Sequence, residues 1–448
     1  MKRILAGVAL IGTAVSAQAA DLATKAPYYK APIVQVYDWT GFYIGVNAGA
    51  GLGRDRAIQN LLPGATTTTY LQSLGALGGG QIGYNYQTNS VFGPLVIGLE
   101  GDFQGADLSD NRTTLFGPVN YSQKLDWFAT ARGRVGIARG PVLNYFTGGF
   151  AVGDVRTTVT EGGFTAFDSG KRTLTGWTIG SGVEAALGGN WTGKIEYLYL
   201  DLGNKTDSFA FLGPQTLQTN VRENIFRVGL NYRIGGNSVY VPAPAANWTG
   251  FYLGGNFGSA TARDRTTATV FGVTEQFNLA PDGFAGGGQI GYNWQASNWV
   301  YGLEADFQGS TQRDNDTAVL LGAVAYDAKL PWFGTVRGRL GYSVGSTLFY
   351  GTGGYAYGKV ETTIASPLGS EKLSKTASGW TAGAGIETPF TLLGLVGPNW
   401  TSKTEYLYVD LGSTDSNFAV GVNTTKVTEH IFRTGINYHF NTPVVAKY

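Results

Sequence analysis

Residues 95–103 read Leu-Val-Ile-Gly-Leu-Glu-Gly-Asp-Phe, and this stretch decides the fold. Side chains of a β-strand point alternately to its two faces, and here large apolar residues alternate with residues that are mostly small or acidic. The first set is Leu95, Ile97, Leu99 and Phe103, and the second is Val96, Gly98, Glu100 and Asp102. A period of two predicts a strand with one apolar face rather than a helix.

The same alternation recurs through residues 39–234. We predict eight strands there, near 39–53, 78–87, 92–104, 123–138, 142–153, 173–187, 191–201 and 222–234. Their connections alternate in length, with long ones at 54–77, 105–122, 154–172 and 202–221. Short turns on one rim and long loops on the other are typical of a transmembrane, antiparallel, up-and-down β-barrel. The expected fold class is therefore all-β.

The polar strand faces carry equal numbers of acids and bases. Charges removed from bulk water persist only when they are paired, and an eight-stranded barrel is just wide enough for side chains to fill it. We therefore expect apolar side chains to face lipid and an ion-pair network to plug the lumen. Its members in the first half are Glu100, Asp102, Arg132, Arg134, Glu184, Lys194, Glu196 and Arg227; in the second half they are Glu304, Asp306, Arg337, Arg339, Glu387, Lys403, Glu405 and Arg433.

The chain is an internal duplication. Trp39-Thr-Gly-Phe-Tyr43 returns as Trp248-Thr-Gly-Phe-Tyr252, and matched motifs stay between 203 (Gly176 to Gly379) and 209 (Trp39 to Trp248) residues apart. The first barrel unit is assigned to 39–234, a proline-bearing linker to 235–247, the second unit to 248–440 and a C-terminal tail to 441–448. The duplication allows two eight-stranded barrels or one sixteen-stranded barrel. The charge balance of each half and the linker favour two.

The N-terminus has the form of an export signal. Residues 1–20 hold Lys2 and Arg3, an apolar run and an Ala-Gln-Ala cleavage site, which predicts a signal peptide for the Sec pathway. Residues 21–38 then form a periplasmic leader. No later stretch of eighteen apolar residues exists, so the mature chain cannot cross a bilayer as helices.

Composition excludes several function classes. Ordinary domains contain about 25% charged residues and about 7% glycine, whereas this chain of 448 residues has 14% charged residues and 68 glycines. Its 32 basic and 31 acidic residues leave no excess for nucleic acid. With no cysteine and two histidines, catalysis and metal binding lack their usual side chains. We expect no enzyme activity, no cofactor and no metal.

Some motifs suggest other functions but fit a barrel better. Gly78-x-Gly80-x-x-Gly83 matches a dinucleotide pattern, yet a strand follows where a helix should begin, so a crowded lumenal face explains these glycines. His430 has no activated serine nearby and is interpreted as a rim residue, and His439 as a polar lumen filler. Aromatic stripes are interpreted as interfacial girdles: Trp127, Tyr197, Tyr199, Trp332, Tyr406 and Tyr408.

Two motifs carry a family resemblance, the opening Tyr37-Asp-Trp-Thr-Gly-Phe-Tyr-Ile-Gly45 and the closing Phe432-Arg-Thr-Gly-Ile-Asn-Tyr-His-Phe440. Through them the chain resembles small outer-membrane β-barrel proteins of rhizobia and related alphaproteobacteria, the RopB-like "porin family". Members typically hold one barrel, whereas this chain holds two copies. The resemblance implies the outer membrane of a Gram-negative cell, with its lipids and lipopolysaccharide as surroundings. It also implies assembly by periplasmic chaperones and the barrel-assembly machinery, which reads an aromatic-ended final strand. The residues that fit this signal are Phe432, Ile436, Tyr438 and Phe440.

The expected function is a structural role in the envelope with limited passive, porin-like permeation. One alternative is a general diffusion porin formed by a single sixteen-stranded barrel, in which the same charges would line an aqueous pore. The other is a surface adhesin or receptor that acts through external loops such as residues 66–73.

Overall fold

The computed structural model describes residues 37–62, 65–91, 93–114, 119–210, 213–235, 246–270, 273–319, 323–366, 369–389, 397, 399–418 and 421–440. The predicted signal peptide, leader residues 21–36, linker residues 236–245 and the C-terminal tail lie outside these ranges. The described residues include no helix that is long and apolar enough to span a membrane.

Eight antiparallel strands close the first barrel. In order around the ring they are β1 (Gly41–Gly53), β4 (Leu74–Ser90), β5 (Gly93–Thr114), β6 (Val119–Arg139), β7 (Val142–Glu161), β9 (Arg172–Gly188), β10 (Trp191–Ala210) and β11 (Pro214–Ile234). The ring closes where β1 pairs with β11, with Val46 opposite Leu230. The other strands of this 11-stranded sheet lie outside the ring: β2 (Asp55–Leu62), β3 (Ala65–Leu71) and β8 (Phe164–Asp168).

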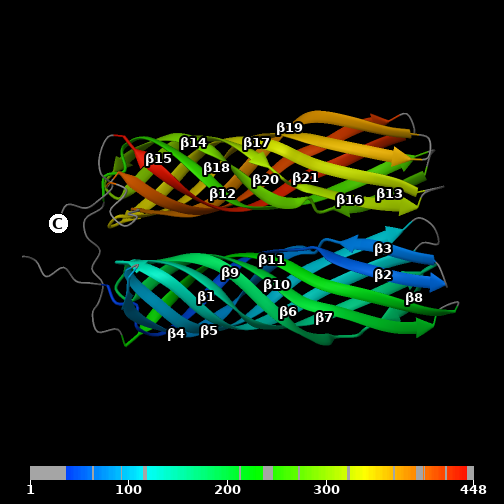
Figure 1. Ribbon diagram of the computed structural model, residues 1–448, viewed down its shortest axis with the longest axis horizontal. Coiled ribbons are helices and arrows are strands. Elements are labelled where there is room, and N and C mark those ends of the chain that lie inside the picture. Colours follow the sequence, from blue (N-terminus) through cyan, green and yellow to red (C-terminus); the bar gives the residue numbers. More distant parts are fainter. Residues whose placement is uncertain are drawn as a thin grey trace, which may run out of the picture. The chain divides into compact units, whose positions relative to one another are not determined.

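The second repeat closes on itself in the same way. Its ring is β12 (Gly250–Val270), β14 (Asp282–Ala296), β15 (Trp299–Ser310), β17 (Ala323–Val344), β18 (Thr347–Ser366), β19 (Gly369–Pro389), β20 (Trp400–Phe418) and β21 (Gly421–His439), with β13 (Val273–Leu279) and β16 (Arg313–Val319) outside it (Figure 1). Leu253 of β12 lies opposite Tyr438 of β21. A sixteen-stranded barrel would need β11 to pair with β12, but each pairs within its own repeat. The prediction of two tandem eight-stranded barrels is confirmed, and the single large barrel is excluded.

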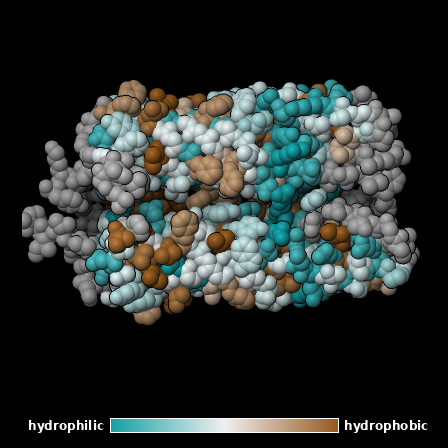
Figure 2. All heavy atoms as spheres, viewed as in Figure 1, coloured by the Kyte–Doolittle hydropathy of each residue, from teal (hydrophilic) through white to brown (hydrophobic). Residues whose placement is uncertain are grey.

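The strands run farther than the sequence predicts. About 9–11 residues are enough for a tilted strand to cross a bilayer, yet β6 has 21 residues and β5 has 22. Much of the predicted long connection 105–122 is therefore strand, because ladder hydrogen bonds continue beyond the apolar zone. Figure 2 shows hydrophobic residues scattered over the left half of the view and a band of hydrophilic residues to the right of its centre.

The outer faces are apolar, as the alternation predicts. Leu99 is 71% exposed and Phe146 is 72% exposed, whereas Val96 and Glu100 of the opposite face are buried. Exposed apolar side chains recur around both rings, including Phe42, Ile44, Ile82, Ile97, Phe103, Val135, Trp177, Ile179, Leu253, Ile290, Leu303, Phe307, Val336 and Leu340. Exposed apolar side chains in this number fit lipid rather than water.

The glycine motif in β4 has a mixed explanation. Gly83 faces the lumen beneath the Tyr43 ring, and an added Cβ would lie 2.3 Å from the Tyr43 hydroxyl. Gly78 and Gly80 face outward, where the nearest atom to an added Cβ is 3.6 Å away. Lumenal crowding therefore explains Gly83 but not Gly78 or Gly80, so the expectation for the whole motif was partly wrong.

We predict that Gly83→Ala destabilises the first barrel by about 1–3 kcal/mol, because the Tyr43 ring must move from its site. Loss of heat-modifiable migration on gels at increasing temperature measures the effect. The outward Gly80→Ala variant is the matched control and should melt like the wild type. Equal melting of the two variants would contradict the packing argument.

Candidate functional site

Arg132 lies at the centre of the first lumen. Its guanidinium bonds Glu100, lies 2.8 Å from Asp102 and 3.2 Å from Glu196, and its side chain is fully buried. Arg227 approaches from β11 and lies 3.1 Å from Asp102 and 2.5 Å from Glu196. Two neighbouring pairs of strands, β5 with β6 and β10 with β11, contribute these groups from opposite sides of the ring, because each strand places its polar face inward.

A second part of the network lies nearer the short-turn rim. Arg134 lies 2.8 Å from Glu184, and Lys194 lies 3.1 Å from Glu100. The structure thus brings together all eight sequence-selected charges of the first repeat. None of them extends into open water, since the side chains are at most 3% exposed.

The second lumen repeats these contacts. Arg337 bonds Glu304 and lies 3.0 Å from Asp306 and 3.3 Å from Glu405. Further pairs include Arg339 to Glu387 at 2.6 Å, Lys403 to Glu304 at 2.9 Å, Arg433 to Asp306 at 2.8 Å and Arg433 to Glu405 at 2.6 Å. The same arrangement therefore forms independently in each barrel.

Neutral hydrogen-bonding residues complete the network, and they are absent from the set that the sequence predicts. The Tyr43 hydroxyl donates to Glu100 at 2.7 Å, and the Tyr145 hydroxyl donates to Glu196 at 2.8 Å. The Arg134 guanidinium also lies over the Tyr145 ring, 4.0 Å from its centre. Strand parity could have found Tyr43, because it shares the lumenal face with Asn47.

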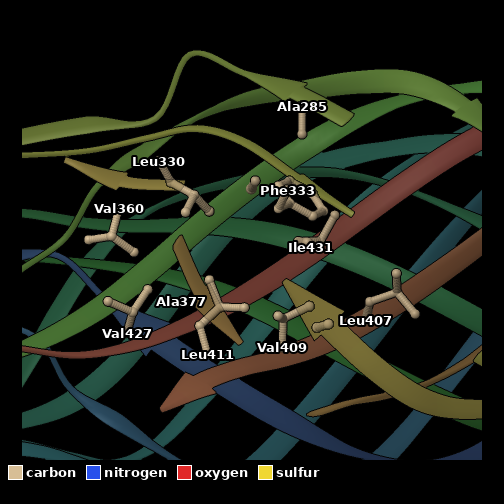
Figure 3. Packing of buried hydrophobic residues seen from close by; sticks show 12 residues of the cluster. Ala285, Leu330, Phe333, Val360, Ala377, Leu407, Val409, Leu411, Val427 and Ile431 are labelled. Atoms are coloured by element: carbon tan, nitrogen blue, oxygen red, sulfur yellow. The ribbon is translucent and has the colours of Figure 1, made fainter. Parts of the chain in front are cut away.

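An apolar layer lies beside the charges on the side of the long connections. Along β10 the inward residues run from Lys194 and Glu196 to Leu198 and Leu200. In the first barrel the layer comprises Leu77, Leu108, Leu125, Phe128, Ala151, Val155, Leu198, Leu200, Leu202, Val221 and Ile225. Figure 3 shows its counterpart in the second barrel, which includes Leu330, Phe333, Leu407 and Ile431. The charge pattern of the sequence predicts polar filling alone and does not reveal this layer.

Tryptophan closes the opposite side of each network. Trp39 is expected in a strand but precedes β1, and its side chain is buried against the short-turn rim. Its indole donates to the Gly140 carbonyl at 3.2 Å, and its ring packs on Tyr37. Trp248 does the same in the second barrel, where its indole donates to Ser343 at 3.0 Å. Each charge network is thus enclosed between apolar groups.

The two histidines lie in different surroundings. His430 is not at a rim: it is buried within β21, and its Nδ1 is 2.7 Å from the Tyr406 hydroxyl. His439 is buried near the short-turn rim, 3.3 Å from Glu387. Among the described residues, no group of His, Asp and Glu side chains could hold a metal ion.

Of the residues assigned to the assembly signal, Phe432, Ile436 and Tyr438 lie in β21, and Phe440 directly follows it. Ile436 and Phe440 face outward and are exposed. Their part in assembly stays a prediction.

We predict that Arg132→Ala lowers the free energy of unfolding by about 3–5 kcal/mol, because it leaves buried carboxylates without their main partner. Urea unfolding of the lipid-embedded protein, followed by tryptophan fluorescence, measures the change. Arg156→Ala, which removes an exposed pair with Asp168, is the control and should cost less than about 1 kcal/mol. A small effect of Arg132→Ala would show that the network does not hold the barrel together.

Comparison with known proteins gives matches over both repeats. The family model described as "Outer membrane protein beta-barrel domain" matches residues 6–233 and 234–440. The "31 kDa outer-membrane immunogenic protein" of Brucella melitensis biotype 1 is 40% identical over 219 residues, covering 44% of this chain and 86% of the relative. The "22 kDa outer membrane protein" of Rhizobium leguminosarum bv. viciae is 36% identical over 204 residues, covering 44% and 80%.

A similar solved structure is the outer membrane protein OprG from Pseudomonas aeruginosa. It is 13% identical in sequence, with a TM-score of 0.28 over 44% of this chain and 99% of that protein.

Proposed function

The chain belongs to the outer-membrane β-barrel protein family and lies in the outer membrane of a Gram-negative bacterium, and we propose that it serves the envelope as a structural, non-enzymatic protein with limited passive permeation. The observation that carries this proposal is the filling of each lumen. An open pore needs a continuous path of water, whereas here an apolar layer, a charge network and a tryptophan follow one another along the axis.

The charges support a structural role rather than ion selection. In a selective pore, unpaired charged side chains line the path and interact with passing ions. Arg132 and Arg227 instead both pair with Glu196, and the three side chains are at most 1% exposed. Ions would have to break these pairs to enter, so we propose that permeation is slow.

The surroundings of the barrels follow from the same proposal. The exposed apolar faces fit acyl chains of outer-membrane lipids, and the hydrophilic strand extensions fit the polar region of lipopolysaccharide. During biogenesis we expect the chain to depend on periplasmic chaperones and the barrel-assembly machinery, with β21 as the recognised strand.

We predict that the purified wild-type protein gives no stable nanosiemens steps in planar bilayers, because the lumen is packed. Phe128→Ala combined with Leu198→Ala should raise the ion leak, since both substitutions open the apolar layer. Leu99→Ala with Phe103→Ala removes similar volume from the lipid face and should leave conductance unchanged. Stable nanosiemens steps in the wild type would overturn the proposal.

A second candidate function is attachment through the long-rim extensions. It is favoured by the hairpin of β18 and β19, where Lys372 bonds Glu361 at 2.7 Å and Lys375 is exposed. Such charged side chains do not belong in lipid, so this part of the hairpin projects beyond the apolar zone.

Replacing residues 363–372 with Asn-Gly tests attachment, because Thr362 and Leu373 face each other across the hairpin and an Asn-Gly turn can join them. Reduced binding of cells or phage, with unchanged heat-modifiable migration, is the expected result. Unchanged binding would remove this hairpin as the attachment site.

A further inference from the structure

We propose that the two barrels of one chain dock against each other in the membrane through a matching flank on each. The docking flank of the first barrel consists of Ile195, Tyr197 and Phe226 on β10 and β11. That of the second consists of Ile386, Tyr406 and Phe432 on β19, β20 and β21. These side chains point away from their own lumens, so the lumenal network does not explain their contacts.

Burial first distinguishes this flank from the rest of the outer surface. On β11, Arg227 faces the lumen, so strand parity places Phe226, Val228 and Leu230 together on the outward face. Val228 is 49% exposed and Leu230 is 45% exposed, yet Phe226 is 4% exposed. Phe432, which corresponds to Phe226 in the second repeat, is 8% exposed. Each is covered by the other repeat.

The aromatic contacts across the flank are reciprocal. Tyr197 stacks on Phe432 with ring centres 5.6 Å apart, and Phe226 lies 4.9 Å from Tyr406. Tyr197 corresponds to Tyr406 and Phe226 to Phe432, so the second contact is the first with the repeats exchanged. An interface in which residue i meets j and j meets i is the signature of twofold symmetry.

A pair of salt bridges shows the same exchange. Arg54 lies 2.9 Å from Asp314, and Arg263 lies 2.9 Å from Asp110. Arg54 corresponds to Arg263 and Asp110 to Asp314. Each aspartate also accepts a backbone N–H of its own barrel at 2.7 Å, from Gln72 or from Ala280. The acceptors are therefore held in place by their own barrel and presented to the other barrel's arginine.

These contacts are the kind that association in lipid requires. Lipid tails are as apolar as the strand faces, so burial of apolar area gives little driving force, and packing and polar contacts must supply it. The linker also keeps the second barrel close to the first, which raises its effective concentration. His430 belongs to this flank: its ring stacks on Phe226 with centres 6.0 Å apart, which accounts for a buried imidazole outside the lumen.

Cysteine cross-linking of the full chain in outer membranes tests the proposal. The natural chain has no cysteine, so Phe226→Cys with Tyr406→Cys introduces the only thiols. A short bismaleimide should give an intramolecular product with altered migration on a denaturing gel. Leu99→Cys with Leu303→Cys places thiols at corresponding, exposed positions and should give no such product. No cross-link at 226 and 406, equal cross-linking at 99 and 303, or only intermolecular dimers would overturn the proposal.

Folding is checked by heat-modifiable migration. Tyr197→Cys with Phe432→Cys provides the reciprocal pair should the first cysteine variant not fold.

The salt bridges are tested in the same cysteine variant. Adding Arg54→Ala and Arg263→Ala to it should reduce the cross-linking yield several-fold, because both salt bridges are lost. Arg156→Ala with Arg313→Ala removes exposed pairs that lie within single barrels and should leave the yield unchanged. Equal yields in the two arginine variants would refute a role for the reciprocal salt bridges.

Discussion

Closing eight strands into a ring leaves an interior that side chains must fill, and the structure depends on this constraint. Arg132 and Arg337 satisfy it with charges, each meeting three carboxylates in a buried site. Such groups stabilise a fold only when every partner is present, because an uncompensated buried charge is strongly unfavourable. The tyrosines that donate to the same carboxylates are therefore part of the network rather than accessories.

The filled interior also connects the fold to the function. The apolar layer and the rim tryptophan enclose the charges from both sides, so the polar lumen of each barrel is packed as an inner core, and the proposal of slow permeation rests on this packing. Duplication has preserved this core in both repeats, down to the pairing of corresponding residues. A chain that gained a second copy thus gained a second closed barrel, since each repeat already satisfies its own strand edges.

Duplication has a further consequence on the outer surface. Two copies of one flank can meet reciprocally, and the covalent linker makes such a meeting far more frequent than between separate molecules. Tyr197 and Tyr406 each meet a phenylalanine of the other repeat, whereas Leu99 and Leu303 stay exposed. The same apolar composition therefore serves contact with lipid on most of the ring and contact with protein on one flank.

Much of this protein could be predicted from alternation along the chain. Side-chain period, connection lengths and paired charges determined a barrel with Arg132 and Glu196 inside and Leu99 outside, because strand parity is a local property. The choice between one ring and two needed the tertiary structure, since the same strands can pair with either neighbour until their registers are known. The tertiary structure was also needed to find the lumenal layer of Leu198 and Phe128 and the burial of Phe226. An apolar side chain alone does not reveal whether lipid, lumen or a second barrel covers it.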